Sequence, residues 1–205
     1  MSAAQGTPEW RQERSGKATA SNFDKVLAKI KTGEAAGRIK YRIQVVTERL
    51  TGNPVDGYQN AAMQWGIATE SEARMAYEAD RGVIVEEVGF IKHATIENCG
   101  ASPDGCVGDD GLVEIKCPES TTHLSWMEAD RLPPEHVAQC QGQMAVTGRK
   151  YLDFVSYDPR FPPNLQSFVV RVPRDDDYIK NLEAEVIVFL KEVDAMVERL
   201  LNRAK

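Results

Sequence analysis

Apolar residues recur every three or four positions in five stretches of the chain, the spacing that gathers them on one face of an α-helix. In the first stretch, Ser21 and Asp24 form a capping-box pattern, and the apolar residues that follow fade at Gly33. The helical spacing returns over residues 41–50, 65–81, 135–147 and 175–201. The helix over 41–50 runs into Thr51-Gly52-Asn53-Pro54 and the next into Gly82, both of which end helices. We therefore expect five helices.

β-Branched and apolar runs between these helices predict five strands. They cover residues 83–91, 99–102, 112–117, 151–157 and 166–172. The second and third of them are joined across Gly108-Asp109-Asp110-Gly111, a turn by its composition. Helices come first, then three strands, a helix, two strands and a helix. This order predicts an α/β (α+β) fold with a central mixed β-sheet flanked by helices, and no repeat or linker divides it.

Composition places the chain among soluble globular proteins, with 205 residues, 42% hydrophobic and 27% charged. The first residues carry no apolar run, so no signal peptide is expected, and no stretch reaches the eighteen apolar residues that a membrane helix needs. We expect a cytoplasmic protein without a membrane partner. The four cysteines lack the spacing of a zinc or iron–sulfur site, so we expect free thiols, several of them buried.

Charge is distributed unevenly along the chain. The net charge is −6, yet residues 1–50 contain ten Lys and Arg against five Asp and Glu. A phosphate-binding surface needs only a local positive field, because screening hides charges beyond ~10 Å. The asymmetry is therefore compatible with a nucleic-acid partner, although it is also common in proteins that never bind DNA.

The candidate chemistry lies in Ser102-Pro103-Asp104-Gly105 and in Glu114-Ile115-Lys116, with nine residues between Asp104 and Glu114. A hairpin across the Gly-Asp-Asp-Gly turn brings Asp104 and Glu114 together, and strand alternation points Glu114 and Lys116 to the same side while Ile115 faces the core. The Ile115 carbonyl is then a further oxygen in reach. For the bare pattern, the competing interpretation of a hairpin with ordinary surface ion pairs is favoured.

Such a set suits a hard divalent ion, Mg²⁺ or Mn²⁺, which prefers oxygen ligands. A bound metal polarises a phosphodiester and supplies a hydroxide, and Lys116 is placed to orient or deprotonate the attacking water.

The wider set of motifs resembles the lambda exonuclease or YqaJ-type phage recombination nucleases of the PD-(D/E)xK superfamily. The motifs are Trp10 with Arg14, Thr19-Ala20-Ser21, Gln64-Trp65-Gly66 with Glu70, Ser102-Pro103-Asp104-Gly105, Glu114-Ile115-Lys116-Cys117-Pro118, Ala138-Gln139 with Gln141, and Tyr157-Asp158-Pro159-Arg160. Each motif is short, but their order and spacing together are specific, and they extend over nearly the whole chain.

The resemblance implies metal ligands in Asp104, Glu114 and the Ile115 carbonyl, with Glu70 adding a carboxylate from its helix. It implies that Lys116 is the catalytic lysine and that Gln139 helps to position it. For Glu70 the alternative is a solvated helix face, the ordinary environment expected for Glu72. For His136, one turn before Gln139, a supporting role and an ordinary hydrogen bond are both open.

The resemblance also implies a 5′-phosphate pocket formed by Arg14, Ser21 and Ser102, although Ser21 has the competing role of a helix cap. Thr122 and His123 stand where the lambda enzyme has a phosphate-binding arginine, which is a departure from the pattern. Met63 is a candidate wedge between terminal base pairs, with plain core packing as the alternative.

The implied activity is a Mg²⁺-dependent 5′→3′ exonuclease that acts on double-stranded DNA ends and leaves a 3′ single strand for recombination. A metal-dependent endonuclease or nickase, and a non-catalytic DNA-binding subunit, are the alternatives. The resemblance further implies a restriction-endonuclease-like core, a ring-shaped homotrimer, a single-strand annealing protein as partner, and a phage or prophage origin in a bacterial cytoplasm. We expect a single nuclease domain over 1–205, with a helical N-terminal part (1–60), a catalytic core (61–175) and a C-terminal helix (176–205).

Overall fold

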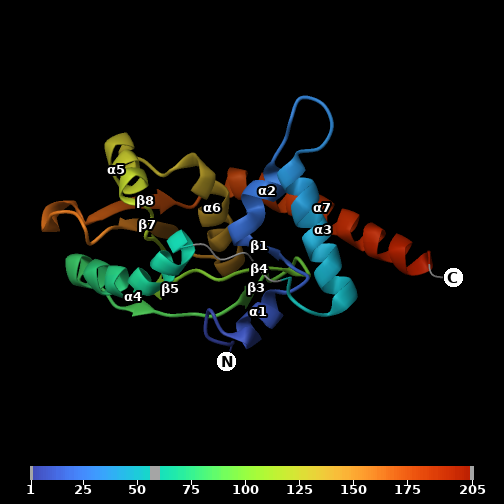
Figure 1. Cartoon of the computed structure of the whole chain (residues 1–205), viewed down its shortest axis with the longest axis horizontal. Helices are drawn as coiled ribbons and strands as arrows, with labels where there is room; N and C mark the ends of the chain where they lie inside the picture. Colours follow the sequence, from blue (N-terminus) through green and yellow to red (C-terminus); the bar gives the residue numbers. More distant parts are fainter. Residues whose placement is uncertain (1, 56–60, 204–205) are drawn as a thin grey trace.

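Two mixed β-sheets lie at the centre of the protein and helices cover them, as the computed structural model shows (Figure 1). The structure describes residues 2–55 and 61–203, without the side chains of Ala62 and Met63. The predicted wedge at Met63 therefore lies outside the described side chains. The mixed sheet with flanking helices confirms the predicted fold class, with the difference that the strands form two sheets.

The larger sheet carries the predicted catalytic strand. Its strands, in spatial order, are β2 (Val85–Glu86), β5 (Gly105–Val107), β6 (Gly111–Lys116), β7 (Tyr151–Tyr157) and β8 (Ser167–Pro173). β6 and β7 run parallel, whereas the other neighbours are antiparallel. The β5–β6 hairpin closes across the predicted turn, where Gly108 adopts a positive φ of 55°. β6, with neighbours on both sides, is held in a central position.

The smaller sheet ties the N-terminal segment to the rest of the molecule. It consists of β1 (Ala18–Thr19), β4 (Cys99–Ala101) and β3 (Ile91–Lys92), with β4 in the middle. β1 pairs with β4 in parallel, so that Ala18 lies opposite Cys99. This pairing brings the segment between Arg14 and Ser21 beside the residues that follow β4.

Seven α-helices and three 3₁₀ turns are present among the described residues. They are α1 (Pro8–Arg14), η1 (Ala20–Asn22), α2 (Phe23–Leu27), α3 (Ala36–Thr51), α4 (Ala61–Arg81), α5 (Ser120–Ala129), η2 (Pro134–His136), α6 (Val137–Thr147), η3 (Pro163–Leu165) and α7 (Asp176–Asn202). The predicted helix ends at Gly52 and Gly82 are confirmed, since both glycines have a positive φ. None of the described helices has the length and apolar character needed to cross a membrane.

The two faces of the larger sheet are covered by different helices (Figure 1). On one face, Ala73 and Tyr77 of α4 pack with Val113, Ile115 and Val155. On the other face α5 and α6 pack with the alternate residues of the same strands; this cluster contains Leu112, Trp126, Cys140, Met144, Leu152 and Phe154. Because side chains alternate along a strand, Glu114 belongs to the face covered by α6.

A third cluster joins the N-terminal helices to α7. Buried residues of α2 and α3, among them Phe23, Val26 and Val45, pack against Val186 and Phe189 of α7. Figure 1 shows α7 running beside α3 along the end of the molecule that is distant from α4 and α5. The four cysteines are free and buried, as expected.

The predicted helix over residues 21–33 is wrong in extent and in its cap. α2 ends at Leu27 because Ala28 adopts an extended conformation, and Ile30 is largely exposed. No side-chain hydrogen bond caps the helix at Asn22, and the Ser21 hydroxyl accepts a hydrogen bond from Arg14 instead. A tertiary partner has replaced the local cap that the sequence pattern indicated.

The predicted strand over residues 83–91 is also wrong, because the chain changes sheets within it. β2 ends at Glu86 and belongs to the larger sheet, whereas β3 begins at Ile91 in the smaller one. Two helices and two strands were not predicted, namely α1, α5, β1 and β5. α1 had a usable signal, since Thr7 accepts a hydrogen bond from the Trp10 amide and Pro8 occupies the first turn.

Candidate active site

Glu114 and Lys116 leave β6 on the same face, as strand alternation predicts. Glu114 is only 2% exposed, and its Oε1 lies 2.5 Å from Nζ of the half-buried Lys116. Ile115 between them is buried in the cluster beneath α4. The surface-hairpin alternative is therefore wrong for Glu114, because a solvated ion pair does not bury its carboxylate.

Asp104 reaches β6 from the segment just before β5. Its Oδ2 accepts a hydrogen bond of 2.6 Å from the Ile115 backbone amide, which places the carboxylate beside the strand that carries Glu114. Gly105 follows because a Cβ there would lie 2.1 Å from Val85 of β2. The predicted proximity of Asp104 and Glu114 is present, although Asp104 is reached through β5 rather than through the strand ending near 102.

Burial and neighbouring carboxylates disfavour the charged form of Asp104. Burial, and then the neighbouring Glu114 and Glu70, raise the pKa of Asp104 well above its ordinary value, against the opposite pull of Lys116. For Lys116, burial lowers the pKa but Glu114 and Asp104 outweigh it, so the pKa is raised. Lys116 is therefore a charged hydrogen-bond donor in this arrangement, and not a free base.

Two amides from α6 hold the Glu114 carboxylate. Gln139 donates to Oε1 at 2.5 Å and Gln143 donates to Oε2 at 2.6 Å. Gln139, predicted to help position Lys116, thus contacts the same oxygen as the Lys116 ammonium. Gln143 was not predicted; the available signal was its position one helical turn after Gln139.

Glu70 and Glu72 lie on opposite sides of α4 and have different surroundings. Burial raises the pKa of Glu70, Arg74 opposes this rise, and Glu114 adds to it, so Glu70 lies within the field of the β6 carboxylate. Glu72 instead accepts a 2.9 Å hydrogen bond from the Tyr157 hydroxyl. The helix presents one of the two glutamates toward the β6 site and the other toward β7.

The donor set fits a hard divalent cation in its chemistry. In the described part of the chain, no three His, Cys, Asp or Glu side chains lie close enough to form a metal cage by themselves. Magnesium is commonly bound through one or two carboxylates and keeps several waters, so Asp104, Glu114 and the Ile115 carbonyl are a sufficient number of donors. The pKa of Asp104 is raised first by burial and then by Glu114 and Glu70, so a bound cation would favour the charged carboxylate.

The three residues predicted to bind a 5′-phosphate come together. Arg14 donates from Nη1 to Ser102 and from Nη2 to Ser21, each at 3.0 Å, and its guanidinium lies 4.3 Å from the centre of the Trp10 ring. Trp10 Nε1 also donates to Ser102 at 3.0 Å. Ser102 is two residues from Asp104, so this cluster adjoins the carboxylates.

The pKa of Arg14 also indicates that the Arg14 cluster lies near Glu114. Burial lowers the pKa of the Arg14 guanidinium, and Tyr41, Glu114 and Glu48 act against that shift. Among the described ion pairs none involves Arg14, so its two hydroxyl partners leave the positive charge without an acidic neighbour in direct contact. A half-buried cation of this kind is suited to an anionic ligand.

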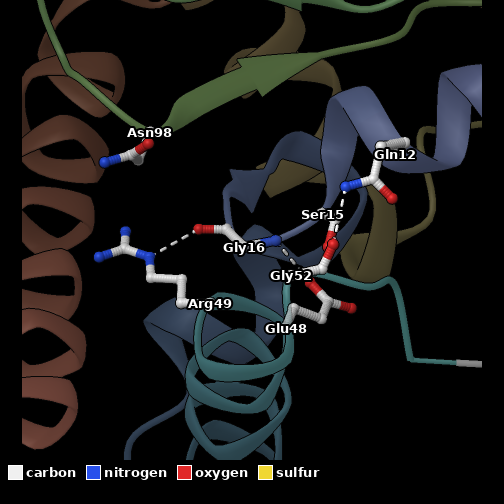
Figure 2. A pocket seen from close by; sticks show the side chains of 7 residues that line it. All are labelled: Gln12, Ser15, Gly16, Glu48, Arg49, Gly52 and Asn98. Carbon is white, nitrogen blue, oxygen red and sulfur yellow. Dashed lines mark hydrogen bonds between the residues drawn. The ribbon is translucent and has the colours of Figure 1, made fainter. Parts of the chain in front are cut away.

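A pocket next to the end of α1 is lined by residues that connect α1 to α3. Figure 2 shows Gln12, Ser15, Gly16, Glu48, Arg49, Gly52 and Asn98 around it. Gly16 donates to Glu48 at 2.7 Å and accepts from Arg49 Nε at 2.8 Å, and it has a positive φ of 72°. These bonds fasten the end of α1, and with it Arg14, to α3.

The two residues at the departure from the family pattern do not form a phosphate site. His123 is fully buried, with its ring nitrogens 2.7 Å from the Ser156 hydroxyl and 2.9 Å from the Leu165 carbonyl. Thr122 lies in the first turn of α5. His136 packs edge-on against Trp126, and burial followed by Lys116 lowers its pKa.

Comparison with known proteins gives two kinds of match. Residues 9–150 match the model of the YqaJ-like viral recombinase domain, a range that contains every site residue from Arg14 to Gln143. The crystal structure of an alkaline exonuclease (LHK-Exo) from Laribacter hongkongensis, also seen in complex with dAMP, is 46% identical, with a TM-score of 0.91 over 97% of this chain and 98% of that one.

A phage-related exonuclease from Haemophilus somnus 129PT is 16% identical, with a TM-score of 0.68 over 90% of this chain and 96% of that one. At this identity the likeness shows the fold alone. No protein in the curated set matches the chain.

Proposed function

The chain belongs to the family of YqaJ-like viral recombinase domains, and on this premise we propose that it is a Mg²⁺-dependent 5′→3′ exonuclease. Its substrate is the end of linear double-stranded DNA, and its product is a 3′ single strand for recombination by strand annealing. By the same resemblance we propose a ring-shaped homotrimer that works with a single-strand annealing protein in the cytoplasm of a phage or prophage host.

One observation carries the choice of a DNA end as substrate. Arg14, Ser21 and Ser102 form a compact cationic and hydroxyl cluster that begins two residues from Asp104. A terminal phosphate carries more negative charge than a phosphodiester and fits the two-pronged guanidinium. Binding of the terminal phosphate at this cluster brings the first phosphodiester of the strand toward the carboxylates. A DNA end is therefore positioned for cleavage better than an internal site.

The chain's own groups divide the work of hydrolysis. Asp104, Glu114 and the Ile115 carbonyl would hold the metal, and Glu70 would add a carboxylate; a bound ion would supply Lewis-acid polarisation of the phosphodiester and activation of a water. Lys116 donates from its ammonium to the reacting oxygens and stabilises the charge that develops on them. Gln139 and Gln143 keep the Glu114 carboxylate in one orientation.

The relative from Laribacter hongkongensis supports end-wise cleavage. It is described as an alkaline exonuclease, and its complex contains dAMP, a deoxynucleoside monophosphate. Removal of nucleotides one at a time from a DNA end releases products of this class.

The decisive experiment uses purified protein with Mg²⁺ on three substrates: a linear duplex with a 5′-phosphate, the same duplex with a 5′-hydroxyl, and a closed circle. We expect mononucleotide release from the linear duplexes, faster with the phosphate, and an intact circle. Labelling each strand at either end shows the polarity. Cleavage of the circle at the linear rate would establish an endonuclease instead.

A further inference from the structure

Arg160 is an exposed cation that the structure holds in place from several sides. Its Nε and Nη2 donate to the carboxylate of Asp158 at 2.7 and 2.9 Å, and Nη2 also lies 3.3 Å from the Pro118 carbonyl. Its guanidinium is 4.6 Å from the centre of the Trp65 ring. Yet 47% of the Arg160 side chain remains exposed, whereas Asp158 is fully buried.

The contacts of Arg160 come from the elements that carry the candidate active site. Trp65 lies on α4 five residues before Glu70, which is a rise of ~7.5 Å along the helix. Pro118 follows Lys116 by two residues, at most ~7 Å along the chain. Asp158 comes directly after β7, the parallel neighbour of β6. Arg160 therefore stands at the rim of the site.

If Arg160 served only to neutralise Asp158, its guanidinium would not need to be exposed at the rim of the site. A buried carboxylate is stabilised best by a partner that is buried with it, whereas Arg160 presents its outer edge to solvent. Long arginine side chains normally lose conformational freedom when they bind a ligand. Stacking on Trp65 and the double hydrogen bond to Asp158 have already removed much of that freedom.

We propose that Arg160 binds a phosphodiester of the DNA backbone next to the one that is cut, and so holds the strand in register across the site. The inference rests on the proposed function, because it takes DNA as the ligand. Arg160 shares no contact residue with Arg14, and we assign the two arginines to different phosphates. Arg14 acts on the terminal group, while Arg160 acts on any sequence and on either kind of 5′ end.

The test measures the affinity of the protein for a linear duplex as a function of salt, in a Lys116→Ala background that cannot turn over. Arg160→Gln should weaken binding several-fold and reduce the slope of log affinity against log salt by about one, the loss expected for one phosphate contact. Arg160→Lys should keep most of the slope. Arg199→Gln, which removes an exposed arginine from the last turn of α7, should change neither.

The double variant Asp158→Asn/Arg160→Gln removes both members of the ion pair, so no buried charge is left alone if Arg160→Gln fails to fold. It should show the same loss of slope at a melting temperature near that of the wild type. An unchanged slope in a folded Arg160 variant would overturn the inference even if the wild type degrades DNA ends. Failure of the wild type to degrade any DNA would instead count against the proposed function, since the binding result is independent of turnover.

Discussion

Gln143 donates a 2.6 Å hydrogen bond to Oε2 of Glu114, and both side chains are almost completely shielded from solvent. The other oxygen of Glu114 is held by Gln139 and Lys116. The carboxylate is thus restrained at both oxygens before any ligand arrives. The carboxylate accepts only, so the Gln143 amide must turn its NH₂ toward Glu114. Its carbonyl oxygen is then buried without a partner among the described groups.

Replacing Gln143 by Leu should lower kcat by roughly tenfold, about 1.4 kcal/mol, because Glu114 keeps its charge but loses one restraint. KM for DNA should change little. Gln141→Leu is the matched control, since the Gln141 amide bonds the Pro173 carbonyl and its oxygen accepts from the Asp175 amide, away from Glu114. That variant should lose thermal stability and retain kcat. Equal kcat in Gln143→Leu and the wild type would show that Gln143 only fills the core.

Removal of divalent metal should abolish cleavage, because Asp104, Glu114 and the Ile115 carbonyl offer the hard oxygen donors that such an ion prefers. Dialysis against EDTA followed by titration with Mg²⁺ or Mn²⁺ should restore the rate. Ca²⁺ should raise the melting temperature, which reports binding to the folded state, while supporting little turnover. Full activity in EDTA would contradict the metal site.

Asp104→Asn should reduce the rate by at least roughly 100-fold, about 3 kcal/mol, and yet stabilise the metal-free protein at alkaline pH. The pKa of Asp104 is raised by folding, so its ionisation costs stability once the pH exceeds the unfolded value. The wild type therefore loses stability relative to the variant as pH rises from the unfolded pKa through the folded one. Asparagine still accepts from the Ile115 amide.

Thermal melts in EDTA across this range measure the effect, with Glu86→Gln on the exposed part of β2 as a surface control. The variant should gain in melting temperature over the wild type as the pH rises. A difference that shrinks with increasing pH would contradict the prediction.

Glu70→Gln should greatly reduce cleavage, whereas Glu72→Gln should leave it nearly unchanged. The two residues are separated by ~200° of helical rotation, and only Glu70 lies in the field of Glu114 and Lys116. Glu72 contributes a hydrogen bond to Tyr157, so its loss should appear as a small drop in melting temperature. Initial rates at saturating Mg²⁺ decide the matter, and comparable rate losses would mean that the assignment of Glu70 is wrong.

Arg14→Gln should slow degradation of 5′-phosphorylated ends far more than that of 5′-hydroxyl ends, because it removes the guanidinium that contacts Ser21 and Ser102. Arg14→Lys should recover only part of the phosphate preference, since it restores the charge without the planar fork. Initial rates on duplexes that differ only in the 5′ group provide the measurement. A preference identical to that of the wild type would place the phosphate pocket elsewhere.

Local periodicity predicted the parts of the site that lie close together in sequence. Glu114 and Lys116 share a face because two residues are one strand period, and the turn after Gly108 brings Asp104 alongside. Arg14 and Ser102 are 88 positions apart in the sequence, and local periodicity cannot predict a contact between residues so far apart. It was expected only through the resemblance to a family.

The errors have a common physical origin in tertiary partners. Ser21 bonds Arg14 instead of capping α2, and the run after Val83 divides between two sheets. In both cases the local signal was present, and a contact with another element replaced the structure that it indicated.

The pairing of β1 with β4 and of α3 with α7 has a consequence for protein synthesis. At ~5–20 residues per second, Cys99 follows its partner Ala18 by roughly 4–16 seconds, and Glu192 follows Arg38, 154 residues earlier, by roughly 8–31 seconds. The ribosome therefore completes the catalytic carboxylates well before the helix that supports the N-terminal part. Under the proposed function, a prematurely terminated chain would carry the proposed metal ligands without the α3–α7 packing that supports the proposed phosphate pocket, and we expect it to lose the preference for DNA ends.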